Sequence, residues 1–267
     1  MTILALGPEG TFSHELAVQA FSEEIRLVPT ISSIFSQVEA GIADGIVPIE
    51  NSEAGGVGPT LDGLLLHHVY ITAELYMPIH HHLASAVPID SIEVIYAHPQ
   101  THEQCSRFID ELGIPVIHTS SNAASAREMM KSKHSAAIVS KMTATLKGLL
   151  LIREHVENNP QNTTRFVVIS NRKKAESDYT KCSILVDPEK DRAGLLYELL
   201  GIFADRGINL TRIESRPSKR GMGQYIFFMD IEYSPACSDA LNALREKARF
   251  RELGCYRVQE VPAWTSD

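Results

Sequence analysis

The sequence predicts an α/β protein of two domains, the first with two lobes and the second with the element order βαββαβ. Three observations lead to this expectation. Residues 1–170 alternate short apolar runs with amphipathic helical segments, which is typical of parallel strands with covering helices. The charged stretch NRKKAESD at 171–178 has the composition of a linker, and the alternation then starts again. At 267 residues the chain is long enough to form two cores.

Composition and charge narrow the class of protein. Apolar residues make up 44% and charged residues 22%, and the net charge of −8 argues against nucleic acid as the main partner. The opening apolar run, 3–6, is too short for a signal peptide or a membrane span, so we expect a cytoplasmic protein without membrane contact. The cysteines lack a CxxC spacing, which predicts reduced thiols at Cys105, Cys182, Cys237 and Cys255.

The loop after the first strand is a candidate anion site. Its sequence, GPEGTFSHELA at 7–17, places Gly10 in a turn and offers Thr11 or Ser13 as the cap of a helix. Free N–H groups and the positive dipole end at a helix start favour an anion, here a substrate carboxylate near Thr11 and Ser13. The motif is not a known phosphate loop, and most loops of this kind bind nothing.

A second candidate loop follows the apolar run at 46–49. It contains three glycines at 55–58, before the helix through 61–65. Asn51 and Ser52 come directly after the strand end, where open α/β sheets carry ligand contacts. A long flexible turn and a lid over a site would both have this composition.

The middle of the chain continues the alternation. We expect strands at 75–83, 92–97, 115–119, 136–139 and 149–153, and helices at 101–112, 122–131 and 141–147. A further strand at 165–169 should return to the first sheet. The result would be one lobe of about 1–74 with 156–178, a second of about 75–155, and a cleft between them.

The run NNPQNTTRF at 158–166 is the candidate centre of activity. It holds four amides, two hydroxyls and one guanidinium, and it ends at the apolar strand VVIS at 167–170. Polar side chains at the start of a buried strand are well placed to face a ligand. The alternative is a capped turn, which Asn-Pro and Asn-Thr usually make.

Histidines at 80–82 raise the question of a metal. Consecutive residues of a strand point to opposite faces, so at most His80 and His82 could share an ion. No acidic residue or cysteine lies at a familiar spacing, and we expect no metal here. Gln104, shortly after the HPQ motif at 98–100, would either reach the cleft or lie on the surface.

The C-terminal part has its own pattern. We expect strands at 181–186, 208–215, 224–233 and 256–261 and helices at 193–206 and 238–248, which is the split ferredoxin-like order. The alternate side chains that should be buried under the helices are Tyr225, Phe227, Met229, Ile231 and Tyr233. The run ESRP at 214–217 carries two charges that a plain hairpin would not need, although a solvated turn is the alternative.

Five motifs in this order resemble prephenate dehydratase with a C-terminal ACT regulatory domain: GPEGTFSHE, VPIENSEAGGV, HPQ with Gln104, NTTRF and GINLTRIESRP. The resemblance spans nearly the whole chain. It implies a type II periplasmic-binding-protein-like catalytic domain at 1–178 and a ferredoxin-like ACT domain at 179–267. It also implies a carbon–oxygen lyase of phenylalanine biosynthesis that converts prephenate to phenylpyruvate without a cofactor, as a homodimer or homotetramer regulated by L-phenylalanine.

The resemblance further implies roles for single residues. Thr164 would carry the catalytic hydroxyl. The substrate-binding residues would be Thr11, Ser13, Asn51, Ser52, Gln104, Thr163, Arg165 and Phe166. The effector-binding residues would be Gly194, Leu195, Leu196, Asn209, Leu210, Glu214, Ser215, Arg216 and Pro217. For Arg165 a second role is open, as a structural anchor that turns inward.

Two positions depart from the family pattern. Ala97 stands where a serine often precedes HPQ, and AGLL at 193–196 stands where the family commonly has Pro-Gly-Ala-Leu. The first removes a hydroxyl from the cleft, and the second places a larger side chain beside the effector pocket. Two rival functions remain at this point: arogenate as the substrate, or an amino-acid-sensing binding protein without chemistry.

Overall fold

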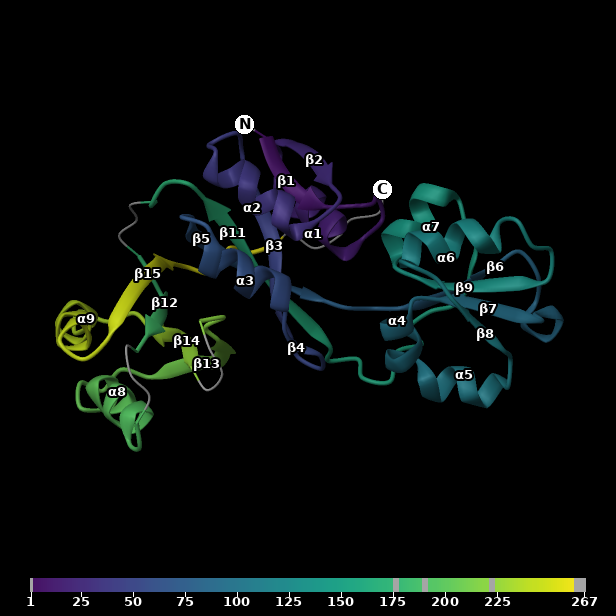
Figure 1. The fold of residues 1–267 in the computed structure, drawn as a ribbon. Helices are drawn as coiled ribbons and strands as arrows, with labels where there is room; N and C mark the ends of the chain where they lie inside the picture. The colour runs from purple at the N-terminus through teal and green to yellow at the C-terminus, as the bar shows by residue number, and fades with distance from the viewer. Residues whose placement is uncertain (1, 175–177, 189–191, 221–223, 262–267) are drawn as a thin grey trace.

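The structure is a computed structural model that describes residues 2–174, 178–188, 192–220 and 224–261. Its strands form three sheets. Figure 1 shows the C-terminal domain at one end, the first lobe in the middle and the second lobe at the other end. Within the described ranges, no helix is long and apolar enough to cross a membrane.

The first sheet has the order β2-β1-β3-β11-β5, with β4 beside β3. Its strands are β1 (Thr2–Leu6), β2 (Glu24–Val28), β3 (Asp44–Asn51), β4 (Gly55–Gly56), β5 (Tyr70–Pro78) and β11 (Thr163–Ser170). The first three are parallel, whereas β11 runs antiparallel between β3 and β5. The predicted return of the late strand to the first sheet is therefore confirmed. The helices of this lobe are α1 (Phe12–Ala20), α2 (Ile31–Glu39) and α3 (Gly58–Leu66).

The second sheet has the order β10-β6-β9-β7-β8. Its strands are β6 (His82–Ser85), β7 (Val94–Ala97), β8 (Val116–His118), β9 (Ser135–Val139) and β10 (Leu151–Arg153). The helices are η1 (Ile89–Ser91), α4 (Pro99–Gln104), α5 (Ser106–Leu112), α6 (Asn122–Met129) and α7 (Lys141–Lys147). Since this lobe lies between β5 and β11 in the chain, it is inserted into the first.

Two predicted elements of this region are wrong. The single strand expected at 75–83 is two strands, because β5 ends in the first sheet and the chain crosses to the second lobe at 79–81 before β6 begins. The helix expected at 101–112 is divided at Cys105, whose φ of −118° and ψ of 15° leave the helical region. The sequence pattern could not show that the chain passes from one sheet to the other, because the residues of β5 and those of β6 are largely buried alike.

The C-terminal sheet is antiparallel, with the order β13-β14-β12-β15. Its elements are β12 (Lys181–Asp187), α8 (Leu195–Ala204), β13 (Leu210–Pro217), β14 (Tyr225–Glu232), α9 (Cys237–Arg245) and β15 (Arg249–Tyr256). The βαββαβ order is confirmed, but the last strand lies earlier than the expected 256–261. The residues after it instead run along β5, where the N–H of Glu74 donates to the carbonyl of Arg257 (3.2 Å).

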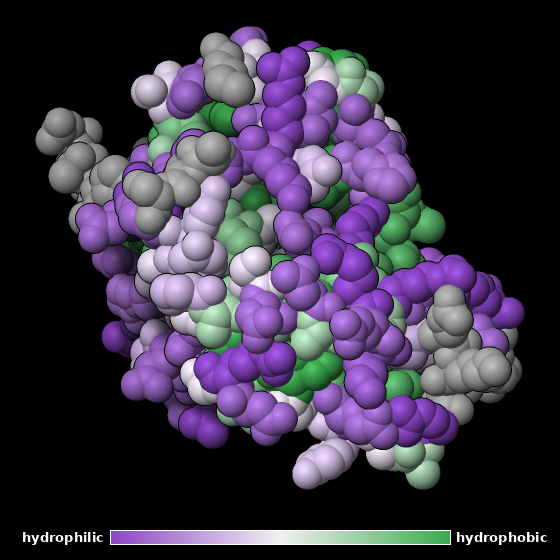
Figure 2. All heavy atoms as spheres, turned by 90° about the vertical axis from the view of Figure 1, so that its left-hand side faces the viewer, coloured by the Kyte–Doolittle hydropathy of each residue, from purple (hydrophilic) through white to green (hydrophobic). Residues whose placement is uncertain are grey.

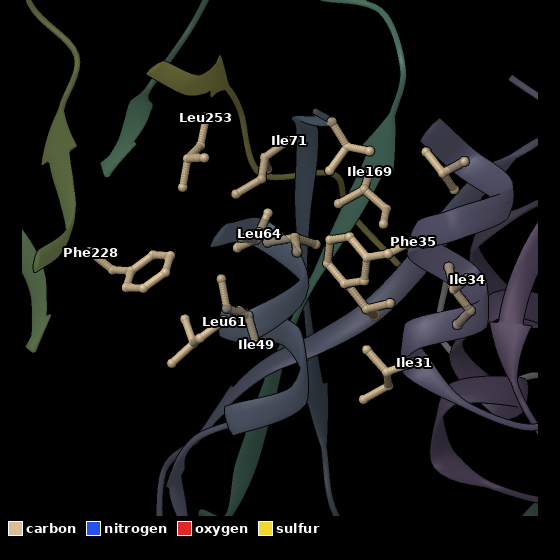
Figure 3. Packing of buried hydrophobic residues seen from close by; sticks show 14 of the residues in the cluster. Ile31, Ile34, Phe35, Ile49, Leu61, Leu64, Ile71, Ile169, Phe228 and Leu253 are labelled. Atoms are coloured by element: carbon tan, nitrogen blue, oxygen red, sulfur yellow. The ribbon is translucent and has the colours of Figure 1, made fainter. Parts of the chain in front are cut away.

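Both faces of the C-terminal sheet are covered, which the alternation of β14 did not predict. Met229 and Ile231 pack under the two helices as expected, whereas Tyr225 is 47% and Tyr233 is 42% exposed. Ile226 and Phe228, on the other face, are buried in one cluster with residues of the first lobe (Figure 3). The residues that meet there are Leu61, Leu64, Ile71, Phe228 and Leu253. The outer side of this domain is largely hydrophilic (Figure 2).

The expectation of reduced thiols is wrong for one pair of cysteines. Cys182 of β12 and Cys255 of β15 lie directly opposite in neighbouring strands and form a disulfide, with their Cα atoms 4.0 Å apart. They are 73 residues apart in sequence, and only the pairing of the first and last strands brings them together. Cys105 and Cys237 are free and buried.

Candidate active site

The end of β3 and the start of β11 bring the two predicted polar stretches together. Because these strands are antiparallel, Asn51 lies opposite Thr164 in the ladder. Nδ2 of Asn51 donates to Oγ1 of Thr164 (2.9 Å) and to Oδ1 of Asn162 (2.7 Å). Oδ1 of Asn51 accepts from the N–H groups of Glu53 (3.1 Å) and Ala54 (2.9 Å). The amide of Asn51 is therefore held on both sides.

Ser52 and Thr163 close this network. The N–H of Ser52 donates to the carbonyl of Thr163 (2.9 Å), and the N–H of Thr163 donates to Oγ of Ser52 (3.0 Å). Oγ1 of Thr163 donates to the carbonyl of Gln161 (3.2 Å). Asn162 is 1% exposed, and its Nδ2 has no hydrogen-bond partner among the described residues. A buried donor without a partner costs free energy, so Nδ2 of Asn162 is a donor that a bound ligand could satisfy.

The side chain of Gln104, the last residue of α4 in the second lobe, contacts the segment 79–81 that links the two lobes. Its Oε1 lies 3.0 Å from Nε2 of His81, which is 1% exposed. Burial lowers the pKa of His81, although Gln104 and the carboxylates of Glu157 and Glu53 oppose this, so the imidazole is neutral at pH 7. Of the two positions considered for Gln104, the structure shows the side chain turned towards the segment between the lobes, and its contact with substrate stays a prediction.

The glycine loop and the second lobe touch directly. Oγ1 of Thr11 caps α1 by accepting from the N–H of His14 (3.2 Å) and donates to the carbonyl of Leu6 (2.7 Å). The carbonyl of Gly10 accepts from Oγ1 of Thr143 (2.7 Å), which lies in α7. Ser13 is 5% exposed in the first turn of α1. The contact between Gly10 and Thr143 fixes the distance between the lobes at this point.

Arg165 points away from the polar network. Residues of β11 alternate, with Phe166 and Val168 in the cluster under α1 and Val167 and Ile169 in the cluster with the C-terminal domain. Arg165 shares the second face, and Phe166 is 1% exposed within the first core. The structure therefore places neither side chain beside the amide of Asn51.

The partners of Arg165 belong to two domains. Its Nε donates to Glu74 (2.6 Å), its Nη1 to Asp230 (2.5 Å) and its Nη2 to the hydroxyl of Tyr256 (2.9 Å). Burial alone lowers the pKa of Arg165, but Asp230, Tyr256 and Glu74 raise it above its ordinary value. The guanidinium stays charged, and its contacts correspond to the inward anchor considered from the sequence.

The predicted effector residues separate into two groups. Gly194, with φ of 80°, precedes α8, and Leu195 is buried while Leu196 is 37% exposed. On β13 the exposed Ser215 and Pro217 alternate with Glu214 and Arg216, which face the first lobe. The second group also includes Leu210, the first residue of β13, and Asn209 directly before it.

The second group contacts the first lobe. Nη2 of Arg216 donates to Oδ1 of Asp62 in α3 (3.0 Å), and Nζ of Lys219 donates to Oδ2 of the same carboxylate (2.9 Å). A Cβ added at Gly56 in β4 would collide with the carboxylate of Glu214. Glu214 and Arg216 of the ESRP run, which is part of β13, therefore face β4 and α3 of the first lobe.

Three residues of this region were not singled out from the sequence. Asn162 lies in the polar run, yet nothing in the run distinguishes it from its neighbours. His81 was considered only together with its neighbours as a candidate metal ligand, and no metal was expected there. Glu15 of α1 is 8% exposed, and burial raises its pKa to about 7, an effect that Ser140 and Lys141 oppose. The sequence signal for Glu15 would have been an acidic side chain directly before the apolar Leu16 and Ala17 of the expected helix, where burial could be anticipated.

Comparison with known proteins gives a consistent result. The model of the prephenate dehydratase family matches residues 3–174, and that of the ACT domain matches residues 189–245. The bifunctional chorismate mutase/prephenate dehydratase of Pseudomonas aeruginosa is 37% identical over 267 residues, which cover 96% of this chain and 73% of that protein. The prephenate dehydratase of Methanocaldococcus jannaschii is 37% identical over 265 residues, covering 94% of this chain and 96% of that protein.

A solved structure supports the same assignment. The crystal structure of prephenate dehydratase in complex with L-Phe from Arthrobacter aurescens has a TM-score of 0.88 and 30% sequence identity. The match covers 100% of this chain and 94% of that one. The resemblance and the fold expected from the sequence are both confirmed. The chain belongs to the prephenate dehydratase family of lyases and carries an ACT domain at its C-terminal end.

Proposed function

We propose that this protein converts prephenate to phenylpyruvate, carbon dioxide and water, as a cytoplasmic step of phenylalanine biosynthesis. The bond between the ring and its carboxylate breaks, and its electron pair enters the ring as carbon dioxide departs. The ring hydroxyl leaves with one added proton as water. Because aromatisation supplies the driving force, the protein has to hold a dianion and deliver one proton to a poor leaving group. Oriented donors and helix N-termini can do both.

The observation that carries the proposal is the direction of the Thr164 hydroxyl. Since Oδ1 of Asn51 accepts from two backbone N–H groups, the atom that faces Thr164 is the donor Nδ2. Oγ1 of Thr164 is the acceptor in that bond, and its own proton is free for a different acceptor. We assign this proton to the departing hydroxyl of prephenate. Donation from Asn51 also stabilises the oxygen as its proton moves away.

The remaining roles follow from position. The start of α1, with Thr11 and Ser13, and the loop with Asn51 and Ser52 would hold the carboxylates of the substrate, because both offer N–H groups without a net charge. Gln104 would contribute from the second lobe. Thr163 lies beside this network and would assist it. We assign Arg165 and Phe166 to positioning Thr164, since both flank it on β11, Arg165 is anchored to Glu74, Asp230 and Tyr256, and Phe166 is anchored in the core of the first lobe.

Replacing Thr164 by valine tests the proton transfer. The shape of the side chain is kept and the hydroxyl is lost, so kcat should fall by about 10² to 10⁴-fold, or roughly 3 to 5.5 kcal/mol of barrier. Thr145→Val, the same change at an exposed position of α7, is the control and should keep normal turnover. Turnover of Thr164→Val within a factor of about three of the wild type would remove Thr164 from the chemistry.

We further propose that residues 1–178 form the catalytic part and residues 179–267 bind L-phenylalanine as the effector. A relative in complex with L-Phe supports this, and so does the position of Glu214 and Arg216, which face β4 and α3 of the first lobe. The chain would work as a homodimer or homotetramer. Among the described residues β13 is an edge strand, available for pairing with a second copy.

The effector site has its own test. Asn209→Ala should raise the phenylalanine concentration needed for half-maximal response by at least about tenfold, which corresponds to about 1.4 kcal/mol of lost binding. Asn242→Ala removes an equally exposed asparagine in α9 and should leave the response unchanged. An unchanged response in both variants would place the effector elsewhere.

A further inference from the structure

The two segments that cross between the lobes bring together four side chains, here named the crossing cluster: His80, His82, His155 and Glu157. The first segment, 79–81, links β5 to β6, and the second, 154–162, links β10 to β11. Figure 1 shows these two connections as the chain between the lobes. Any group that joins the two segments therefore acts on the connection between the lobes.

The donor atoms of this cluster converge on one oxygen. Nδ1 of His80 lies 2.7 Å and Nδ1 of His155 lies 3.3 Å from Oε1 of Glu157. All three atoms fall within 4.8 Å of one another. Zinc binds imidazole nitrogen and carboxylate oxygen at about 2.0–2.1 Å, so neighbouring ligands of a tetrahedral ion lie about 3.3 Å apart. The separation between Nδ1 of His155 and Oε1 of Glu157 matches that spacing, whereas the 2.7 Å between Nδ1 of His80 and Oε1 is a hydrogen-bond distance that widens when an ion replaces the shared proton.

The surroundings hold these atoms in place. The side chain of Glu157 is only 2% exposed, and its other oxygen accepts from the N–H of His81 (2.9 Å). The N–H of His155 donates to Nδ1 of His82 (3.2 Å), and His155 itself has φ of 54°, which a residue other than glycine rarely adopts. Backbone N–H groups thus hold the carboxylate of Glu157 and the ring of His82, and the rings of His80 and His155 are held by Oε1 of Glu157.

A cavity next to the cluster gives access to these atoms and is lined by one more carboxyl group. It has a volume of about 470 Å³ and is lined by His80, His82, His155 and Glu15, among others. Glu15 is 8% exposed, and its Oε2 has no hydrogen-bond partner among the described residues. A carboxyl oxygen without a partner and three imidazoles, all of them groups that can bind a metal ion, therefore line one cavity.

We propose that the crossing cluster binds one divalent transition-metal ion, with Nδ1 of His80, Nδ1 of His155 and Oε1 of Glu157 as ligands. Two imidazoles and one carboxylate suit Zn²⁺, Ni²⁺ or Cu²⁺, whereas Mg²⁺ and Ca²⁺ prefer oxygen ligands. With three protein ligands the ion keeps a position open towards the cavity. The ion joins the two crossing segments and so stiffens the connection between the lobes. Metal binding at this site does not depend on which substrate the protein uses.

Zinc binding to the full-length protein, freed of metal with EDTA, tests the site by titration calorimetry. The wild type should bind one ion per chain. Loss of a supporting group near a metal costs roughly 10- to 100-fold in affinity, so loss of a ligand in His155→Ala or Glu157→Gln should cost at least about tenfold. Glu157→Gln keeps the size of the side chain and one acceptor oxygen, which can still accept from the N–H of His81, so it separates the loss of a ligand from a loss of structure.

His118→Ala is the matched control. His102 and His118 form another close histidine pair, with Nδ1 and Nε2 2.9 Å apart on the surface, and neither belongs to a group of three metal-binding side chains among the described residues. This variant should bind Zn²⁺ as the wild type does. Substitution by Co²⁺ should give a visible absorption band in the wild type and in His118→Ala, and none in His155→Ala. The proposal is overturned if the wild type binds no zinc at micromolar concentration, or if His118→Ala and not His155→Ala loses the ion.

Discussion

Asp230→Asn should destabilise the protein more than any exposed charge change, because it removes one carboxylate from a buried ionic network. Arg165 and Lys181 supply two positive charges, and Glu74 and Asp230 supply two negative ones. The side chains of Arg165, Glu74 and Asp230 are 5%, 1% and 4% exposed. The substitution removes one of the three carboxylates around Arg165 and leaves its buried guanidinium with Glu74 (2.6 Å) and with the partly exposed Glu50 (3.7 Å). Breaking a buried pair in this way costs about 3–5 kcal/mol.

Urea unfolding followed by circular dichroism measures this cost. Glu128→Gln, which breaks the exposed pair with Lys131, is the control and should change the free energy of unfolding by no more than about 1 kcal/mol. Adding Arg165→Met to Asp230→Asn should recover part of the loss, because Glu74 and Lys181 then remain as a balanced pair. A loss below about 1 kcal/mol for Asp230→Asn, or a double variant worse than the single one, would refute this reasoning.

Three further predictions concern Glu15, Gly10 and the substrate. Burial raises the pKa of Glu15 from 4.5 to about 7, so the protonated form is favoured in the folded protein and stability falls as the pH rises from 4.5 through 7. The free energy of unfolding of Glu15→Gln, relative to that of the wild type, should therefore increase by about 2 kcal/mol as the pH rises from about 5 to about 8. Thermal or urea unfolding at the two pH values measures this change, and an equal difference at both would contradict the raised pKa of Glu15. Gly10→Ala should raise the KM for prephenate several-fold, because φ is +88° and the new Cβ would lie 2.7 Å from Oγ1 of Thr143. The control is Gly113→Ala, where φ is +63° and no atom lies within 4 Å of the new Cβ, and it should leave KM unchanged. Prephenate should be turned over in preference to arogenate when both are supplied, and exclusive release of phenylalanine would reverse that assignment.

Much of the fold could be predicted from the sequence because its local signals agree with its packing. The alternation of strands and helices identified both lobes, and the pattern after the linker identified the βαββαβ order. Asn51 and Thr164 came from separate motifs, yet both stood at strand ends, and antiparallel pairing of those strands made them neighbours. A strand end is a local property, so sequence reasoning can find it.

The features that escaped prediction depend on contacts between distant segments. β14 has two buried faces because the first lobe covers one of them, and Ile226 and Phe228 do not differ in type from the residues under the helices. The disulfide between Cys182 and Cys255 requires the first and last strands of the sheet to be neighbours. In the same way, the histidines at 80–82 lacked an acidic partner nearby in sequence, and the second crossing supplies Glu157.

The most direct test of the account is the fate of prephenate with the purified protein at neutral pH, followed by the ultraviolet absorption of phenylpyruvate and by release of carbon dioxide. We expect both products in equal amounts from the wild type and a rate at least about 10²-fold lower from Thr164→Val. Prephenate that stays unchanged in the presence of the wild type, or equal rates from the two proteins, would contradict the central claim that this site delivers a proton to the departing hydroxyl.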